Sequence, residues 1–374
     1  MKIADRGLVF LGEEGGERSS ACFHGACVLP GGRWLVAFRA SPKKADAYPQ
    51  RVLVTWSDDG GKTWSPPAEP CDVQAVSGAA GAWRAGQPTA LGGRRVAMVL
   101  YWVDASDPRR PFFNPQTEGL LDSRIFLTLS DDAGQTWSTP QRLDTSPLTM
   151  PIAITGPILL LPSGEWALQF ETNKPYDDTS VWHHKSVLMY SRDEGNTWPE
   201  FAVAAADPEA RLFYWDQRPR VLADGTILDL FWTFDRQRAV YLNIHARASG
   251  DNGRTWSDLW DTGVPGQPAP PASLPDGRIV MPYVDRQRTP IIKLRVSTDG
   301  ARTWPASTEL VLDDRLNQAQ EGGKSSMQDA WSEMAAFSVG LPTTAGLAHG
   351  DVLVVYYAGL KTDHTGLYWV RLRP

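Results

Sequence analysis

One octapeptide recurs five times along the chain, and this repeat constrains the fold more than any other feature of the sequence. Each copy begins with serine, has aspartate at its third position and closes with Thr-Trp. The copies are SDDGGKTW (57–64), SDDAGQTW (130–137), SRDEGNTW (191–198), SGDNGRTW (249–256) and STDGARTW (297–304). Each follows an alternating apolar run that is typical of a β-strand entering a hairpin turn. Such a repeated motif predicts an array of similar β units.

The chemistry of the octapeptide is that of a turn. Its aspartate can accept hydrogen bonds from backbone N–H groups, and glycine adopts backbone conformations that a Cβ opposes. The tryptophan supplies a large apolar plate for packing between sheets. A repeated aspartate is also compatible with catalysis or calcium binding, but a local turn accounts for every copy. We therefore interpret the repeat as structural.

Six hairpins of a second kind accompany the octapeptides. Each has an apolar strand, a glycine-containing turn and another apolar strand; they occupy residues 25–38, 87–102, 156–170, 218–232, 271–284 and 334–357. Five precede an octapeptide, and the sixth precedes a last strand at 367–372, which the N-terminal run 7–11 can complete. The sequence therefore predicts an all-β fold, a six-bladed β-propeller with four-stranded antiparallel blades. The N-terminal strand closes the ring in the last blade, and residues 1–374 form one domain.

Charge and cysteine content exclude several classes of function. The chain has 37 basic and 43 acidic residues, a net charge of −6, and no basic cluster, so nucleic acid is not an expected partner. No apolar stretch approaches a membrane span, and the N-terminus has no apolar leader. The 3 cysteines are an odd number without zinc-type spacing. We expect reduced thiols, a cytoplasmic location and no metal or other cofactor; the oligomeric state stays open.

Five octapeptides in a six-hairpin frame resemble the Asp-box repeats of the sialidase (neuraminidase) superfamily, and the resemblance covers nearly the whole chain. It implies an active site at the axial mouth of the propeller, away from the repeats. The expected parts are three arginines on a substrate carboxylate, an aspartate acid/base in a first-blade loop and a tyrosine–glutamate nucleophilic pair. Other proteins with this repeat have other functions, so the fold alone does not fix the chemistry.

The first blade matches this pattern best. Its segment LVAFRASPKKADAYPQRVLVTWSDDGG resembles the sialidase stretch that carries an arginine and the catalytic loop. The resemblance implies that Arg39 binds a carboxylate and that Asp46 is the acid/base; an ordinary surface loop is the alternative. Family members begin this blade with Arg-Ile-Pro, where this chain has CFHG. His24 stands near the missing arginine, either as an acid/base or ligand contact or as a structural histidine.

The fourth blade offers a carboxylate. The segment YWDQRPRVLADG (214–225) resembles the strand on which sialidases place the glutamate that polarises the tyrosine. Asp216 falls at that position, with Tyr214 and Arg218 beside it. Either Tyr214 or His24 could instead take a proton next to a uronate carboxylate in a lyase reaction.

Two identical tetrapeptides, DRQR at 235–238 and at 285–288, follow strands of adjacent blades. Sialidases place their other two carboxylate-binding arginines in these regions, although strict counting puts Trp232 at one position. We expect an anion clamp from these side chains, namely Arg236, Arg238, Arg286 and Arg288. The alternative is Asp–Arg pairing that only ties the blades together.

The sixth blade departs from the family pattern. The segment DAWSEMAAF (329–337) resembles the strand that carries the sialidase tyrosine, but Trp331 holds that position. Indole cannot be the nucleophile, so Trp331 is expected to stack on a sugar ring. Glu333, two residues on, is expected to face the same side of the strand. Gln87 and Glu171 are further candidates for the axial mouth.

These features favour a sialidase-like exo-glycoside hydrolase acting on a carbohydrate that bears a carboxylate. Asp46 would be the acid/base, with Asp216 and Glu333 as further carboxylates. An acidic-polysaccharide lyase or a neutral glycosidase on the same fold is the first alternative. A non-catalytic propeller that binds glycans or proteins is the second. An enzyme predicts carboxylates and arginines converging on an axial pocket, whereas a scaffold predicts that those charges pair with one another.

Overall fold

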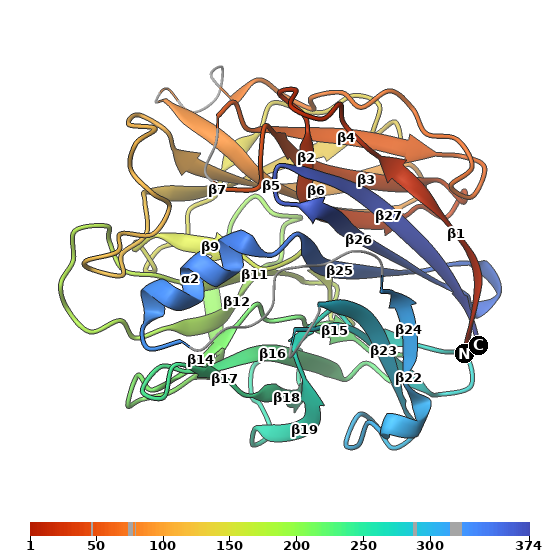
Figure 1. Ribbon diagram of the computed structural model, residues 1–374. Coiled ribbons are helices and arrows are strands. Elements are labelled where there is room, and N and C mark those ends of the chain that lie inside the picture. Colours follow the sequence, from red (N-terminus) through yellow and green to blue (C-terminus); the bar gives the residue numbers. More distant parts are fainter. Residues whose placement is uncertain (46–47, 74–77, 79, 287–289, 315–323) are drawn as a thin grey trace.

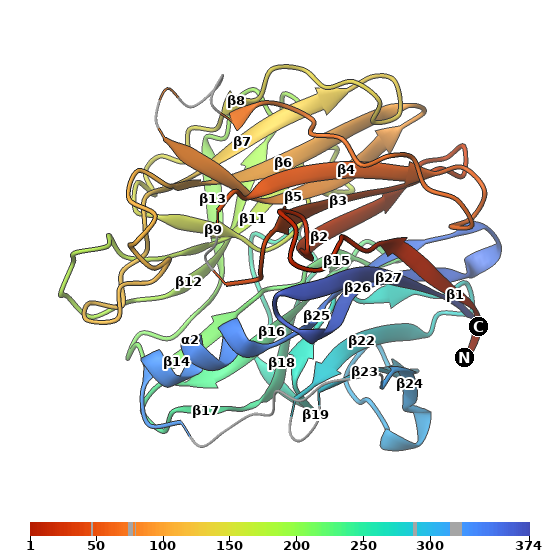
Figure 2. The same ribbon diagram turned by 45° about the horizontal axis from the view of Figure 1, so that its top comes forward.

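In the computed structural model, which describes residues 1–45, 48–73, 78, 80–286, 290–314 and 324–374, β-sheets follow one another around a ring (Figures 1 and 2). The first sheet region has β1 (Lys2–Phe10), β2 (Ser20–Val28), β3 (Trp34–Ser41) and β4 (Arg51–Ser57), with β25 (Val339–Gly346), β26 (Val352–Lys361) and β27 (His364–Arg373) from the other end of the chain. The next sheet has β5 (Gly81–Gly92), β6 (Arg95–Asp104), β7 (Ser123–Ser130) and β8 (Gln141–Arg142).

The remaining three sheets come from the middle of the chain. The first contains β9 (Ile152–Ile154), β10 (Leu159–Leu160), β11 (Trp166–Thr172), β12 (Lys185–Ser191) and β13 (Glu200–Ala206). The second contains β14 (Leu212–Trp215), β15 (Arg220–Val221), β16 (Ile227–Asp235), β17 (Val240–Tyr241), β18 (Asn243–Ser249) and β19 (Trp260–Pro265). The third contains β20 (Gln267–Pro268), β21 (Ala272–Ser273), β22 (Ile279–Asp285), β23 (Ile291–Ser297) and β24 (Leu310–Asp313). Helix α2 (Met327–Ala336) and two short 3₁₀ turns, η1 (Ala306–Thr308) and η2 (Ala348–Gly350), complete the described elements.

The apolar core lies in layers between neighbouring sheets rather than at one centre. Val36 of β3 packs in one cluster with Leu353 of β26, and Val280 of β22 packs in another with Val354 of β26. Burial of apolar surface contributes about 25 cal/mol per Å². Apolar layers of this kind join each sheet to its neighbours, and the all-β propeller arrangement is confirmed.

The two ends of the chain meet in one sheet. β1 pairs antiparallel with β27 with Gly7 opposite Trp369, and both termini lie side by side (Figure 1). This pairing is the one expected for the N-terminal strand, and it removes an exposed sheet edge.

The grouping of strands differs from six separate four-stranded sheets. Hydrogen bonds group the described strands into five sheets of seven, six, five, five and four strands. The seven-stranded sheet arises because Ser20 of β2 pairs with Thr365 of β27, which joins β25–β27 to β2–β4. In other sheets the innermost strand is divided into two short strands. For example, β14 and β15 both pair with β16, so this sheet has more than four strands.

The octapeptides form the same turn each time, as predicted. In the first copy Ser57 Oγ donates to Asp59 Oδ1 at 2.8 Å, while Thr63 donates its N–H to Oδ1 at 2.9 Å and its hydroxyl to Oδ2 at 2.7 Å. Asp132, Asp193, Asp251 and Asp299 repeat this pattern. The Thr63 hydrogen bonds lower the pKa of Asp59 to about 2. All five aspartates are therefore occupied in holding their turns.

Residues 329–337 are not the strand that the resemblance implied. Most of them lie in helix α2, whose N-cap Ser326 accepts a hydrogen bond from the Asp329 N–H. Asp329 in the first turn stabilises the helix further through the helix dipole. Serine followed three residues later by an acidic residue is a helix-start signal that the sequence already contained.

Candidate functional site

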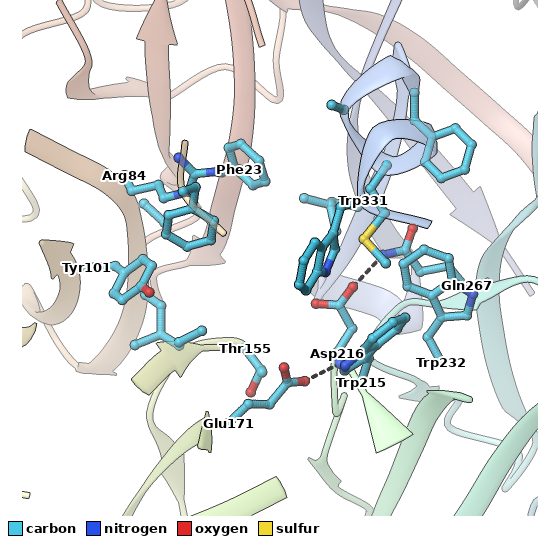
Figure 3. Close-up of a pocket in the computed structure, with 18 of the residues that line it drawn as sticks. Phe23, Arg84, Tyr101, Thr155, Glu171, Trp215, Asp216, Trp232, Gln267 and Trp331 are labelled. Atoms are coloured by element: carbon cyan, nitrogen blue, oxygen red, sulfur yellow. Dashed lines mark hydrogen bonds between the residues drawn. The ribbon is translucent and has the colours of Figure 1, made fainter. Parts of the chain in front are cut away.

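A cavity of about 500 Å³, a volume typical of small-molecule sites, is lined by residues from all five sheets and from helix α2. Aromatic side chains make up much of its wall: Phe23, Tyr101, Phe112, Phe113, Trp182, Trp215, Trp232, Trp331, Phe337 and Tyr357. The charged residues of the wall are Lys44, Arg84, Arg218, Arg286, Glu171 and Asp216. Figure 3 shows Phe23, Arg84 and Tyr101 on one side of an open space, facing Trp331, Trp232 and Trp215.

Asp216 is one of the two carboxylates among the described residues of this wall. It directly follows β14 and has φ of 50°, a left-handed conformation that is uncommon outside glycine and often marks a functional site. Its Oδ2 accepts a hydrogen bond from Gln267 Nε2, and its Oδ1 lies 3.3 Å from Arg218 Nη2. Its side chain is 29% exposed, so the carboxylate is held in place and still reaches the cavity.

Glu171, at the end of β11, meets Asp216 from the neighbouring sheet. Its Oε1 accepts the backbone N–H of Asp216 (Figure 3), and its Oε2 lies 3.4 Å from Nε2 of the buried His184. The two carboxylates therefore lie at the same part of the wall.

Gln267 links Asp216 to a buried cation. Its Oε1 accepts from Arg286 Nη2 at 2.6 Å, while Arg286 Nη1 donates to the Val339 carbonyl at 3.0 Å. The Arg286 guanidinium also lies 3.8 Å from the centre of the Phe337 ring. A hydrogen-bonded chain from Asp216 through Gln267 to Arg286 fixes the orientation of all three side chains.

Two further nitrogen groups of the wall have lowered pKa values. Burial, helped by the nearby Arg286, lowers the pKa of Lys44 to about 7, and Lys44 Nζ donates to the Met334 carbonyl of α2. Burial lowers the pKa of His24 to about 4, so this imidazole is neutral at pH 7. His24 Nε2 lies 2.9 Å from the Val355 carbonyl, which requires the proton to be on Nε2.

Helix α2 covers one side of the cavity. Trp331 stacks on Phe113 with ring centroids 4.5 Å apart and planes 5° apart, and Gln328 Nε2 donates to the Pro115 carbonyl. Both rings line the cavity, and each uses one face to pack against the other.

The structure brings together many of the residues expected at the axial mouth. Those that line the cavity are His24, Gln87, Glu171, Asp216, Arg218, Arg286 and Trp331. They come from several sheets, from the segments that follow their strands and from helix α2. Asp46 and Arg288 lie outside the described residues, so their predicted roles stay predictions.

Three predicted arginines are placed elsewhere. Arg39 is fully buried below the cavity, where its Nη2 donates to the Lys44 carbonyl at 2.6 Å and so supports the segment that carries Lys44. Arg236 pairs with Glu118 at 2.5 Å outside the main cavity, and Arg238 is exposed to solvent. None of the three lines this cavity, so their predicted part in carboxylate binding stays a prediction.

Tyr214 and Glu333 also do not line the cavity. The Tyr214 ring packs against Phe231, because alternate residues of β14 face opposite sides and Trp215 takes the cavity side. Glu333 pairs with Lys324 at 2.9 Å. Its expected direction assumed a strand, whereas in a helix two residues are about 200° apart and Glu333 faces away from Trp331.

Several lining residues were missed, including Lys44, Arg84, Gln267 and Tyr357. Gln267 had a signal in the sequence, because the pair Gln267-Pro268 repeats the pair Gln87-Pro88, whose glutamine also lines the cavity. Lys44 had no such signal in the sequence, because its burial depends on α2 covering the first-blade loop.

The described part of the chain has neither a metal-site cluster nor a membrane-spanning helix. No group of three or more His, Cys, Asp or Glu residues there is placed to hold a metal ion. No helix in the described ranges is long and apolar enough to cross a membrane.

Comparison with known proteins agrees with this architecture. A sialidase of Micromonospora viridifaciens is 25% identical over 300 residues, which are 78% of this chain and 37% of that protein. This chain thus spans little more than a third of that relative. A protein of unknown function from Dyadobacter fermentans has a TM-score of 0.74 at 18% identity, covering 100% of this chain and 99% of that one.

An intramolecular trans-sialidase from Ruminococcus gnavus has a TM-score of 0.65 at 13% identity, covering 98% of this chain and 96% of that one. At these identities the structural likeness establishes the fold alone. The model of the BNR repeat-like domain matches residues 96–319, which is more than half of the chain. The protein therefore belongs to the BNR repeat-like domain family, as a divergent member with the sialidase fold.

Proposed function

We propose that this protein is a glycoside hydrolase that removes a terminal, carboxylate-bearing sugar in the axial cavity. The observation that carries the proposal is the placement of Asp216. Its carboxylate reaches an aromatic cavity while Gln267 and Arg218 hold it, and Glu171 accepts its backbone N–H. Glycoside hydrolysis usually requires two carboxyl groups. In this proposal they are those of Asp216 and Asp46, and Glu171 holds the backbone of Asp216 in place.

The charges of the wall support an anionic sugar. Lys44, Arg84, Arg218 and Arg286 face only two carboxylates, Glu171 and Asp216, among the described lining residues. An acidic group bound there would find an excess of positive charge in a partly enclosed site, where electrostatic attraction is stronger than in water. The Trp331–Phe113 pair would contact the apolar face of the sugar ring.

Hydrolysis is favoured over a lyase reaction by the state of the two candidate bases. Tyr214 does not line the cavity. His24 lines it, but Nε2 is bonded to the Val355 carbonyl, and Nδ1 is buried without a hydrogen-bond partner. Neither nitrogen is placed to remove a proton from a substrate. Asp46 keeps its predicted role as acid/base in this proposal.

The proposal also includes six blades. The seven-stranded sheet is counted as two blades, one made of β1 and β25–β27 and the other of β2–β4, which the Ser20–Thr365 pair joins. The other four sheets are one blade each. The axial position of the cavity then matches that expected for a sialidase-type site.

The proposal is tested by screening fluorogenic sialosides, uronides and neutral glycosides. Wild type would be compared with Asp216→Ala and Asp46→Ala, and Glu333→Gln would be the control because Glu333 is an acidic residue outside the cavity wall. We expect cleavage of an acidic glycoside that Asp216→Ala abolishes and Glu333→Gln preserves. Full activity in Asp216→Ala would overturn the assignment, and no cleavage by wild type would favour a glycan-binding propeller.

A further inference from the structure

Helix α2 lies outside the sheets and is attached to the cavity wall unevenly along its length (Figure 1). In its N-terminal half, Met327 and Ala330 are buried in an apolar cluster with side chains of β14 and β16. In its C-terminal half, Ser332 and Ala335 line the cavity and are exposed. The structure therefore anchors the first half of α2 more firmly than the second.

Lys44 ties the C-terminal half of α2 to the propeller. Its Nζ donates to the Met334 carbonyl in the last turn, where the helix dipole is negative. The same Nζ lies 5.9 Å from the centre of the ring of Phe337, the residue that caps α2. The end of the helix and its cap therefore cover the Lys44 amine, which is buried.

The described surroundings of Lys44 oppose a positive charge. Burial and three neighbouring cations lower the pKa of Lys44 to about 7; the cations are Arg286, Arg39 and Arg84. The Cys22 thiol acts in the opposite direction, and the Tyr357 ring lies 5.7 Å from Nζ. The covered position therefore favours the neutral amine more than water does.

Exposure of Lys44 to water reverses this effect. A hydrated lysine has a pKa of about 10.4, so Lys44 gains affinity for a proton when the helix end leaves it. Below about pH 7 the amine is protonated in both positions, and the full cost of burying its charge opposes closing. Above about pH 7 the covered amine is neutral and this cost falls. Closing is therefore favoured progressively from about pH 7 towards about pH 10.

We propose that the C-terminal half of α2 is a lid on the axial cavity and that closing this lid releases a proton from Lys44. The lid closes more firmly as the pH rises and opens more readily as the pH falls. Ser332, Met334 and Ala335 line the cavity, so their departure widens its entrance. This device goes beyond the proposed function, because it controls access to the cavity whatever ligand binds there.

Hydrogen exchange of the α2 amides measures the opening without a substrate. A detached helix of 10 residues is marginal in water, so α2 loses its hydrogen bonds when it leaves the wall. We expect the protection of these amides, corrected for intrinsic exchange, to rise about tenfold from about pH 6 to about pH 8. Lys44→Met and Lys44→Gln remove the titrating amine and should lose this rise. Lys43→Met is the matched control and should keep it, because Lys43 is an exposed neighbour.

The amides of β12 show in each variant whether the sheets stay folded. The α2 amides should exchange faster than those of β12 at every pH, which distinguishes a local opening from unfolding of the whole protein. Exchange of α2 and β12 at the same rate would overturn the lid. Equal protection of α2 at both pH values in wild type, or the same rise in the Lys44 variants, would overturn the release of a proton from Lys44.

Discussion

Glu171 accepts the backbone N–H of Asp216 across the junction of two sheets. This contact supports the left-handed backbone of Asp216, whose φ is 50°, and so determines where the Asp216 carboxylate points. Glu171 is therefore a positioning residue for the proposed reaction, in addition to lining the cavity.

The first prediction concerns this contact. Glu171→Gln keeps an acceptor oxygen for the Asp216 N–H, whereas Glu171→Leu removes it. We expect Glu171→Leu to lower kcat about 100-fold, because small displacements of reacting groups are costly, and Glu171→Gln to retain most of kcat. Steady-state kinetics on the best glycoside of the screen check this. Equal losses in both variants would show that the charge of Glu171, not its hydrogen bond, matters.

Lys44 gives the cavity a predicted pH dependence. Burial and Arg286 lower its pKa to about 7, so its positive charge is present below that pH and lost above it. Affinity for a carboxylate ligand should therefore fall as the pH rises through about 7. His24, whose pKa is about 4, is neutral throughout this range and does not contribute.

Calorimetry with glucuronate and N-acetylneuraminate, from about pH 6 to about pH 8.5, measures this effect. We expect Lys44→Met to bind weakly at every pH and to lose the pH dependence. A pH dependence that persists in Lys44→Met would assign it to another group.

The sequence predicted best what is determined locally. The octapeptide turns are held by contacts within eight residues, such as Thr63 to Asp59, so the motif alone specifies their geometry. The pairing of β1 with β27 also followed, because an unpaired last strand needs a partner. Asp216 was expected at the start of an innermost strand, and it lines the cavity from the break between β14 and β15.

The predicted residues that do not line the cavity are those whose side-chain direction depends on details of the backbone. In β2, the register shifts between Cys22 and Gly25, where Phe23 has φ of 49°, and this irregularity changes which residues reach the cavity. Arg39 lies opposite Cys22, and its Nη2 donates to Cys22 Sγ and to the Lys44 carbonyl instead. Glu333 does not line the cavity because it lies in a helix that begins after Ser326, where the resemblance implied a strand.

The second pH prediction concerns stability. Asp229 in β16 is fully buried, and neither carboxylate oxygen has a hydrogen-bond partner of normal geometry. Burial raises its pKa well above the usual value, an effect that the nearby Arg218 and Leu230 N–H groups only partly oppose. The folded protein thus keeps this proton at pH values where the unfolded chain has lost it. Its contribution to stability is present at low pH and falls as the pH rises above about 4.

Asp229→Asn removes this ionisation while keeping the shape of the side chain. We expect it to raise the free energy of unfolding at neutral pH by at least about 1 kcal/mol, with no gain near pH 4. Urea unfolding at both pH values measures the difference. Asp258→Asn, at an exposed position of the same sheet region, is the control and should change stability little. A gain at neutral pH that is no larger than at pH 4 would contradict the raised pKa.

The last prediction concerns the fifth position of the octapeptide turns. Gly134 has φ of 86° there, and a Cβ on it would lie 2.0 Å from Leu35 Cδ1. Ala301 takes the equivalent place with φ of 68°, buried in the layer between β16 and β22. Gly134→Ala should therefore lower the free energy of unfolding by roughly 1–3 kcal/mol, through backbone strain and overpacking. Ala301→Gly has two opposing effects. It relieves backbone strain, but it also removes methyl packing and raises the conformational entropy of the unfolded chain. The free energy of unfolding should therefore stay within about 1 kcal/mol of wild type. Urea unfolding of both variants measures the contrast. Equal destabilisation by the two substitutions would show that methyl packing, not backbone conformation, controls this position.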